Sequence, residues 1–428
     1  MKHIPIPSEL FISNRDRLRA LLPAGTLAVL NANDILPTNA DGTLLLHQNS
    51  DLFHLTGIDQ EETILVIAPG AFEEKNREIL FIRQPSEFVE TWEGHKFTKE
   101  EATKISGIKN VRWVSDFAGV LRALMGECDE VFLNLNEHAR STSEVETRDA
   151  RFVRDTKRRF PLHTFRRLAP LMHRLRMVKS AHEIALLREA CAVTARGFRR
   201  VARFVKPGVN EAEIEAEFAH EFIRNKSQFA YSPIIASGKN NCVLHYVAND
   251  QTCRKGDLVL LDVAAARGNY ASDLTRTIPV SGKFSKRQKQ VYNAVLRVLR
   301  GSIAGAVAGK LHRDWQNEAK AMMADELLAL GLIKPRDVKR QTPDKPACAK
   351  YFNHGLGHHL GLDVHDVCDL RQPMEPGFVL TVEPGIYIPE EGFGVRLEND
   401  IVVTENGPVD LMAGIPIEAD EIEHLMRR

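Results

Sequence analysis

Residues 351–402 read YFNHGLGHHLGLDVHDVCDLRQPMEPGFVLTVEPGIYIPEEGFGVRLENDIV, and this stretch decides both the fold and the chemistry of the chain. Ionisable residues occur here at close intervals, each on a glycine-rich turn or beside an apolar run. A carboxylate within apolar sequence is costly to bury unless it is paired or binds a metal. We therefore expect the rest of the chain to complete a site around these residues, which are His354, His358, His365, Glu383 and Glu398.

Length and composition indicate a globular protein of two or three domains. The chain has 428 residues, of which 43% are hydrophobic and 27% charged, too many residues for one ordinary core. Lys plus Arg and Asp plus Glu both total 57, so the formal net charge is zero. Binding to phosphate backbones favours a basic surplus, so nucleic acid is not expected as a partner.

The sequence also favours a cytoplasmic location. No apolar run approaches the roughly 18 residues that a membrane helix needs, and the first residues lack the apolar core of a secretion signal. The six cysteines show no CxxC spacing, which is typical of reduced thiols and not of a disulfide framework. We expect no membrane partner.

The first part of the chain, residues 1–165, is predicted to form an α/β domain. Short apolar runs alternate there with polar turns, and one helical segment at 121–127 separates the last two runs. A charged segment at 137–161 is interpreted as a solvated helix or linker, because acidic and basic residues are interleaved. No catalytic constellation is evident in this part. The expected strands lie at 27–33, 62–70, 78–85, 111–117 and 130–136.

The second part, residues 166–428, is predicted to be an α+β domain. Ser180 with Glu183, and Asn210 with Glu213, have the spacing of capping boxes, in which two side chains satisfy the first backbone donors of a helix. Further helices are expected after Ser285 and over 313–331. Strand-like runs follow each helix pair, so the domain repeats one arrangement without a detectable sequence repeat.

Asp262 ends the apolar run 258–261, and Asp273 follows after the turn-like sequence GNYAS. A turn between two strands would bring these carboxylates together, and they would repel each other unless a cation lay between them. The alternative is that one acid caps a turn and the other is exposed. An Asp pair is weak evidence on its own.

The remaining acids lie in similar positions. Glu383 follows an apolar run, and alternation along a strand places Glu398 on one face with Arg396 and Asp400. A surface pair between Arg396 and Glu398 is the simpler alternative. His354 and His358 have the spacing of two zinc ligands on a helix, but the glycines disfavour a helix and the catalytic Glu of that motif is absent.

Together these residues predict a binuclear metal site. Four carboxylates balance the charge of two divalent cations, and an oxygen-rich shell with one imidazole suits Mn²⁺ or Co²⁺, with Zn²⁺ as another choice. Two such ions activate a water as a nucleophile. The predicted ligands are Asp262, Asp273, His358, Glu383 and Glu398.

In order and context, this ligand set resembles that of the M24 metallopeptidases with the "pita-bread" fold. These include methionine aminopeptidases, Xaa-Pro aminopeptidases (aminopeptidase P) and Xaa-Pro dipeptidases (prolidases). The resemblance covers about 170–428 and is most specific at HGLGHHLGLDVHD, LTVEPGIY and VRLEND. HQNSDLFHLTG resembles the amino-terminal domain of the proline-specific branch, which methionine aminopeptidases lack.

The resemblance implies a role for each residue. Asp262 would chelate one metal, while Asp273 and Glu398 bridge both. His358 and Glu383 would complete the shells, and Glu383 would also act as the base. His245 would lie near the substrate, His365 would contact the peptide and stabilise the tetrahedral intermediate, and His354 and Arg396 would support the ligands. A buried structural histidine remains the alternative for His354.

The sequence departs from the family pattern in two places. His359 lies where relatives often carry an aromatic residue, and the segment 366–377 is short. Both features border the site, so they bear on contacts with the substrate beyond proline.

The function implied is hydrolysis of the amino-terminal Xaa-Pro bond of peptides by a homodimer or homotetramer. A prolidase is the nearest alternative, and it would need a cation for the substrate carboxylate, for which Arg371 is the obvious candidate. A non-catalytic peptide-binding protein or a metal-free creatinase-like hydrolase is disfavoured, because neither would keep all five ligands.

Overall fold

A computed structural model describes residues 4–142, 144–342 and 345–427 of the chain. The chain forms two compact units, Pro5–Arg176 and a second unit that begins at Met177. Among the described residues, no helix is both long and apolar enough to cross a bilayer.

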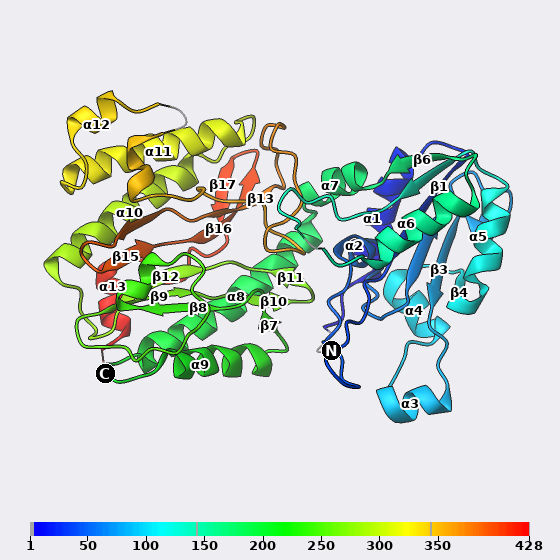
Figure 1. The fold of residues 1–428 in the computed structure, drawn as a ribbon, viewed down its shortest axis with the longest axis horizontal. Helices are drawn as coiled ribbons and strands as arrows, with labels where there is room; N and C mark the ends of the chain where they lie inside the picture. The colour runs from blue at the N-terminus through cyan, green and yellow to red at the C-terminus, as the bar shows by residue number, and fades with distance from the viewer. Residues whose placement is uncertain (1–3, 143, 343–344, 428) are drawn as a thin grey trace. The chain divides into compact units, whose positions relative to one another are not determined.

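The first unit contains a six-stranded mixed sheet with the order β4-β3-β2-β1-β5-β6. Neighbouring residues of β1 face opposite sides, so that Leu27 and Val29 enter one core while Ala28 and Leu30 enter the other. Helices cover both faces (Figure 1), which explains why the strands read as continuous apolar runs. The strands are β1 (Thr26–Asn31), β2 (Ile64–Ile67), β3 (Glu78–Ile82), β4 (Val111–Trp113), β5 (Glu130–Leu133) and β6 (Thr164–Arg167).

Four helices of this unit, α2, α3, α4 and α6, begin at a side-chain cap. Asn49 caps α2 through two backbone N–H groups, and Thr98 forms a capping box with Glu101 at the start of α4. The charged segment predicted as helix or linker contains α6. The helices are α1 (Ser8–Leu21), α2 (Ser50–Thr56), α3 (Glu87–Glu93), α4 (Lys99–Ser106), α5 (Phe117–Met125), α6 (Arg148–Arg159) and α7 (Ala169–Met177).

The first unit extends beyond residue 165, the boundary expected from the sequence. Strand β6 pairs in parallel with β5, with Phe165 opposite Val131, and Leu168 just before α7 and Met172 within it enter the core that contains Ala28 and Leu30 of β1. Three of the four β6 residues are exposed, so this strand lacks the apolar run that marks the others. A boundary at 165 would divide β6, and the compact unit in fact ends at Arg176.

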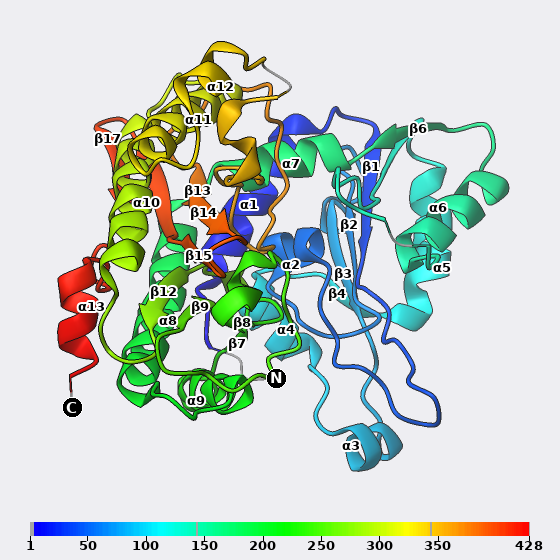
Figure 2. The same ribbon diagram turned by 60° about the vertical axis from the view of Figure 1, so that its left-hand side comes forward.

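The second unit contains two helix pairs, each packed on its own set of strands, as the sequence predicts (Figures 1 and 2). Helices α8 (Ala181–Phe204) and α9 (Glu211–Arg224) share a core with β8 (Ile234–Ser237), β9 (Leu258–Asp262) and β12 (Thr275–Pro279). Both capping boxes expected here are formed, at Ser180 and Asn210, and the helix expected after Ser285 also begins with a capping box.

The second helix pair covers the C-terminal strands. Its core joins α10 (Lys286–Gly305) and α11 (His312–Ala329) to the strands β13 (Val379–Val382), β14 (Gly385–Ile388), β15 (Phe393–Arg396) and β16 (Asn399–Thr404). The smaller elements are β7 (Gln228–Phe229), β10 (Ala265–Arg267), β11 (Tyr270–Ala271), α12 (Pro335–Lys339), β17 (Gly407–Asp410) and α13 (Ala419–Leu425).

Candidate metal centre

Strand pairing brings Asp262 and Asp273 together, as the sequence predicts. Strands β9 and β12 are antiparallel, with Asp262 opposite Thr275. The Tyr231 hydroxyl lies 2.6 Å from Asp262 Oδ1 and 2.7 Å from Asp273 Oδ1. Both carboxylates therefore converge on one point at the end of the β9–β12 pair.

Glu398 reaches the same point from between two strands. The sequence predicts one continuous strand through 396–400, but β15 ends at Arg396 and β16 begins at Asn399, in different sheets. The Glu398 N–H donates to the Thr275 carbonyl at 3.0 Å, and the Thr275 hydroxyl donates to Glu398 Oε2 at 2.6 Å. Bonding to β12 interrupts the strand and aims Glu398 at the two aspartates.

Arg396 does not form a surface pair with Glu398. Its side chain is only 5% exposed, and its Nη2 lies 2.5 Å from Asp262 Oδ2. Its Nε donates to the Thr275 hydroxyl and its Nη1 to the Tyr387 hydroxyl. The guanidinium therefore holds Asp262 from within the protein.

His358 lies in a bend and not in a helix, as its flanking glycines indicate. Its N–H donates to the Thr381 hydroxyl, and Gly357 approaches so closely that an added Cβ would be 2.0 Å from the Thr381 carbonyl oxygen. The ring Nδ1 lies 3.0 Å from the His359 carbonyl oxygen, and the opposite ring nitrogen, Nε2, faces the carboxylates of Asp273 and Glu383.

Four of the five predicted ligands, including His358 itself, come close together at that nitrogen. His358 Nε2 lies 3.6 Å from Asp273 Oδ2 and 3.8 Å from Glu383 Oε1. One atom each of Asp273, His358 and Glu398 falls within 4.8 Å of the others, a spacing that one metal ion can span. Asp262 joins this carboxylate cluster through the Tyr231 hydroxyl.

The electrostatics of the cluster fit bound cations. Burial raises the pKa of Asp273 well above its ordinary value, and the neighbouring Asp262 charge raises it further. The pKa of Glu398 is raised by burial and then by the charge of Asp273. Buried carboxylates that repel one another bind divalent cations, and an oxygen-rich set with one imidazole suits such ions.

His354 belongs to the layer behind the ligands. Its Nε2 bonds to the Tyr387 hydroxyl at 2.8 Å, and its Nδ1 lies 3.9 Å from Glu383 Oε2. Burial lowers the pKa of His354 to about 4, so its imidazole is neutral at physiological pH. The Tyr387 hydroxyl also accepts from Arg396, so it connects His354 to Arg396, which is more specific than core filling.

The other two predicted histidines lie on the exposed side of the cluster. The His365 ring is 4.2 Å from the His358 ring at an interplanar angle of 81°. His245 is also exposed, and its charge contributes to the lowered pKa of His354. His359, by contrast, is 3% exposed and packs on Phe378, so its ring faces the core.

Sequence reasoning missed three residues that hold the site, namely Tyr231, Thr275 and Tyr387. Each contributes a hydroxyl to a carboxylate or to Arg396, and each lies in an apolar or turn segment without a local signal. Tyr231 precedes β8, which pairs with β9 and places Ile234 opposite Asp262. Only that strand pairing identifies Tyr231.

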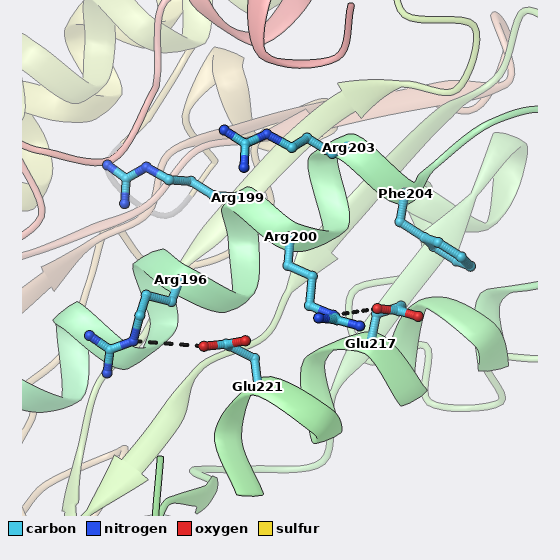
Figure 3. Close-up of a pocket in the computed structure, with 7 residues that line it drawn as sticks. All are labelled: Arg196, Arg199, Arg200, Arg203, Phe204, Glu217 and Glu221. Carbon is cyan, nitrogen blue, oxygen red and sulfur yellow. Dashed lines mark hydrogen bonds and ion pairs between the residues drawn. The ribbon is translucent and has the colours of Figure 1, made fainter. Parts of the chain in front are cut away.

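A hollow between α8 and α9 contains none of these residues. Figure 3 shows Arg200 paired with Glu217 and Arg196 paired with Glu221, whereas Arg199 and Arg203 point away from both glutamates. The pairs connect the two helices, and this hollow is distinct from the carboxylate cluster.

The fold and the cluster together define a metallopeptidase. Residues 185–405 match metallopeptidase family M24, and residues 11–132 match the aminopeptidase P N-terminal domain. The chain belongs to metallopeptidase family M24, and it is an enzyme with the pita-bread fold in its C-terminal unit.

Individual relatives are similar over nearly the whole chain. An Xaa-Pro aminopeptidase of Escherichia coli is 34% identical, covering 97% of each chain, and one of Haemophilus influenzae is 33% identical, covering 98% of each. Solved structures of Escherichia coli aminopeptidase P superpose with 32% identity. The form in complex with substrate has a TM-score of 0.88 over 99% of each chain, and the zinc-substituted form in complex with product has 0.89 over 99% of this chain and 100% of the other.

Proposed function

We propose that this chain is an Xaa-Pro aminopeptidase that releases the first residue of peptides whose second residue is proline. The observation that carries the proposal is the similarity to an Escherichia coli Xaa-Pro aminopeptidase across both units, at 34% identity over 97% of each chain. The presence of all five predicted ligands in one cluster supports catalysis over mere peptide binding.

The prolidase alternative is not favoured. It needs a cation that meets the substrate carboxylate, and Arg371 is the candidate that the sequence offers. The Arg371 side chain is 90% exposed and forms a bidentate ion pair with Asp369. Its Nε donates to Asp369 Oδ1 at 2.8 Å, and its Nη2 donates to Asp369 Oδ2 at 2.9 Å. A guanidinium used in this way is not free to close a binding pocket.

Asp262, Asp273, His358, Glu383 and Glu398 would hold two divalent metal ions, for which Mn²⁺ is our first choice and Co²⁺ or Zn²⁺ the alternatives. When bound, the ions supply Lewis-acid polarisation of the scissile carbonyl and a water of lowered pKa. Asp273, His358 and Glu398 would contribute ligand atoms that lie within 4.8 Å of one another.

The side chains around the cluster would carry the remaining chemistry. Glu383 accepts the proton of the attacking water and passes it to the leaving proline nitrogen. A ring N–H of His365 donates to the oxyanion that develops on the carbonyl oxygen. His245 contacts the substrate, whereas Arg396 and His354 act as positioning residues.

The decisive experiment compares an Xaa-Pro dipeptide with an Xaa-Pro-Yaa-Yaa peptide, using the Mn²⁺-loaded protein. We expect release of Xaa from the longer peptide, and no release by Glu383→Ala. Cleavage of the dipeptide alone would replace the proposal with a prolidase, and no cleavage by metal-loaded protein would reject it.

We also propose a cytoplasmic homo-oligomer, a dimer or a tetramer. The six cysteines are free thiols, in agreement with a reducing compartment. Light scattering tests the oligomer, which a monomeric mass of 48.1 kDa would contradict. Cell fractionation with an antibody against the chain tests the location.

A further inference from the structure

A buried ion pair lies next to the candidate site but outside the carboxylate cluster. Lys179 Nζ is 2.9 Å from Asp366 Oδ2, and each side chain is only 1% exposed. Removing both charges from water is expensive, and such a pair often stabilises a fold no better than well-packed apolar residues would. A buried pair therefore calls for an explanation other than stability.

Asp366 directly follows His365 in a segment that lacks helix and strand. Main-chain bonds hold the segment at a few points: the Asp366 N–H donates to the His359 carbonyl at 2.8 Å, and the Asp369 N–H donates to Met177 Sδ at 3.2 Å. The Lys179–Asp366 pair adds a charged anchor beside the histidine.

Lys179 contacts both ends of this segment. Its backbone N–H donates to the Gly377 carbonyl at 2.9 Å while its side chain reaches Asp366. A Cβ on Gly361 would be 2.2 Å from Asp366 Oδ2 and 3.0 Å from Lys179 Cε, so a glycine is needed for the pair to form there. The absence of a side chain at Gly361 therefore leaves the space that the Lys179–Asp366 ion pair occupies.

Lys179 is itself held in place. It immediately precedes Ser180, the cap of α8, whose N–H and hydroxyl both donate to Glu183 Oε2, and the Tyr270 hydroxyl donates to Glu183 Oε1. Lys179 is therefore held at the start of a 24-residue helix, and its ion pair with Asp366 restrains the segment that carries His365.

We propose that Lys179 is a positioning residue that acts through Asp366 to hold His365 over the carboxylate cluster. The inference rests on the proposed function, in which His365 meets the peptide. Without the pair the segment keeps its main-chain bonds, but the His365 imidazole loses the orientation that places it 4.2 Å from His358. A misplaced catalytic group lowers kcat more strongly than it weakens substrate binding.

Lys179→Met tests the proposal by steady-state kinetics with the Xaa-Pro-Yaa-Yaa peptide. We expect kcat to fall about tenfold or more while KM changes little and the metal content by elemental analysis stays at the wild-type value. Lys310→Met is the matched control, because Lys310 pairs with Glu318 at the surface and should leave kcat unchanged.

A double-mutant cycle separates positioning from general damage. In a His365→Ala background, Lys179→Met should cause no further loss of kcat, because the group through which it acts is gone. Losses that multiply in the double variant would overturn the proposal.

A lone charge left by Lys179→Met can prevent folding, so K179M/D366N provides a second route. It removes both charges with little change in volume, and we expect a wild-type unfolding temperature with kcat still reduced. Recovery of wild-type kcat would overturn the proposal.

NMR gives a readout that does not need peptidase activity. The His365 imidazole resonances should shift or broaden in K179M/D366N, and unchanged resonances would overturn the proposal. Wild-type protein that cleaves no peptide would instead contradict the proposed function and leave this measurement to decide on Lys179.

Discussion

Arg396 Nη2 lies 2.5 Å from Asp262 Oδ2, and the two side chains are only 5% and 13% exposed. The same guanidinium donates to Thr275 and Tyr387, so its three nitrogens serve three partners in fixed directions. A lysine ammonium cannot reproduce this planar arrangement. Arg396 therefore orients a predicted metal ligand and does more than balance its charge.

We expect Arg396→Lys to lower kcat/KM or metal affinity about 10- to 100-fold, since outer partners of metal ligands have effects of this size. Peptide hydrolysis and metal titration measure the two quantities. Arg287→Lys is the control, because Arg287 pairs with Glu391 at a half-exposed site. Equal activities of the two variants would show that the direction of the Arg396 bonds is unimportant.

Tyr231→Phe removes the hydroxyl between Asp262 and Asp273. Hydrogen bonds to charged groups contribute about 1.5–3 kcal/mol, and this one also fixes the spacing of two predicted ligands. We expect weaker metal retention, seen as metal loss at lower chelator concentration.

The matched control for that variant is Tyr246→Phe. The Tyr246 hydroxyl donates to Glu211 at 2.9 Å, away from the cluster, so its loss should lower stability without changing metal retention. If both tyrosine variants keep metal equally well, Tyr231 plays no part in the site.

Gly357→Ala should disrupt the bend that carries His358. An added Cβ would lie 2.0 Å from the Thr381 carbonyl oxygen, and backbone cannot move away cheaply. We expect a loss of stability of about 1–3 kcal/mol, the usual range for overpacking, together with reduced metal content. Gly414→Ala meets nothing within 4 Å and serves as the control. Thermal unfolding of both variants would reveal the difference, and equal midpoints would contradict it.

Much of the fold could be predicted because helix caps and apolar strands are visible as local sequence patterns. The capping boxes at Ser180 and Asn210, the helix expected after Ser285 and the apolar strands predicted the order of elements in the second unit. Strand β6 was not predicted, because its residues are mostly exposed and its pairing with β5 is a long-range property without a local pattern.

In the candidate site, too, local patterns indicated some contacts, whereas others depend on long-range packing. The spacing of Asp262 and Asp273 indicated their proximity, since a strand pair must return across the sheet. The sequence did not reveal that Arg396 faces Asp262 instead of Glu398, because the strand is interrupted at Glu398 by its bond to Thr275. Tyr231 and Tyr387 depend on tertiary packing alone.

Removal of metal should change how stability depends on pH. Burial and neighbouring charges raise the pKa of Asp273 and Glu398 well above the ordinary carboxyl value of about 4. Between that value and the raised one, the folded chain binds more protons than the unfolded chain, so the free energy of unfolding falls as pH rises. Cations bind the deprotonated carboxylates, so bound metal opposes this decrease in the free energy of unfolding.

We therefore expect the unfolding temperature in chelator to decrease as the pH rises above the ordinary carboxyl pKa of about 4. In saturating Mn²⁺ the midpoint should stay constant or rise. Glu398→Gln, which removes one of the titrating groups, should flatten the slope in chelator. Parallel pH dependences with and without metal would mean that these carboxylates do not titrate as the buried cluster requires.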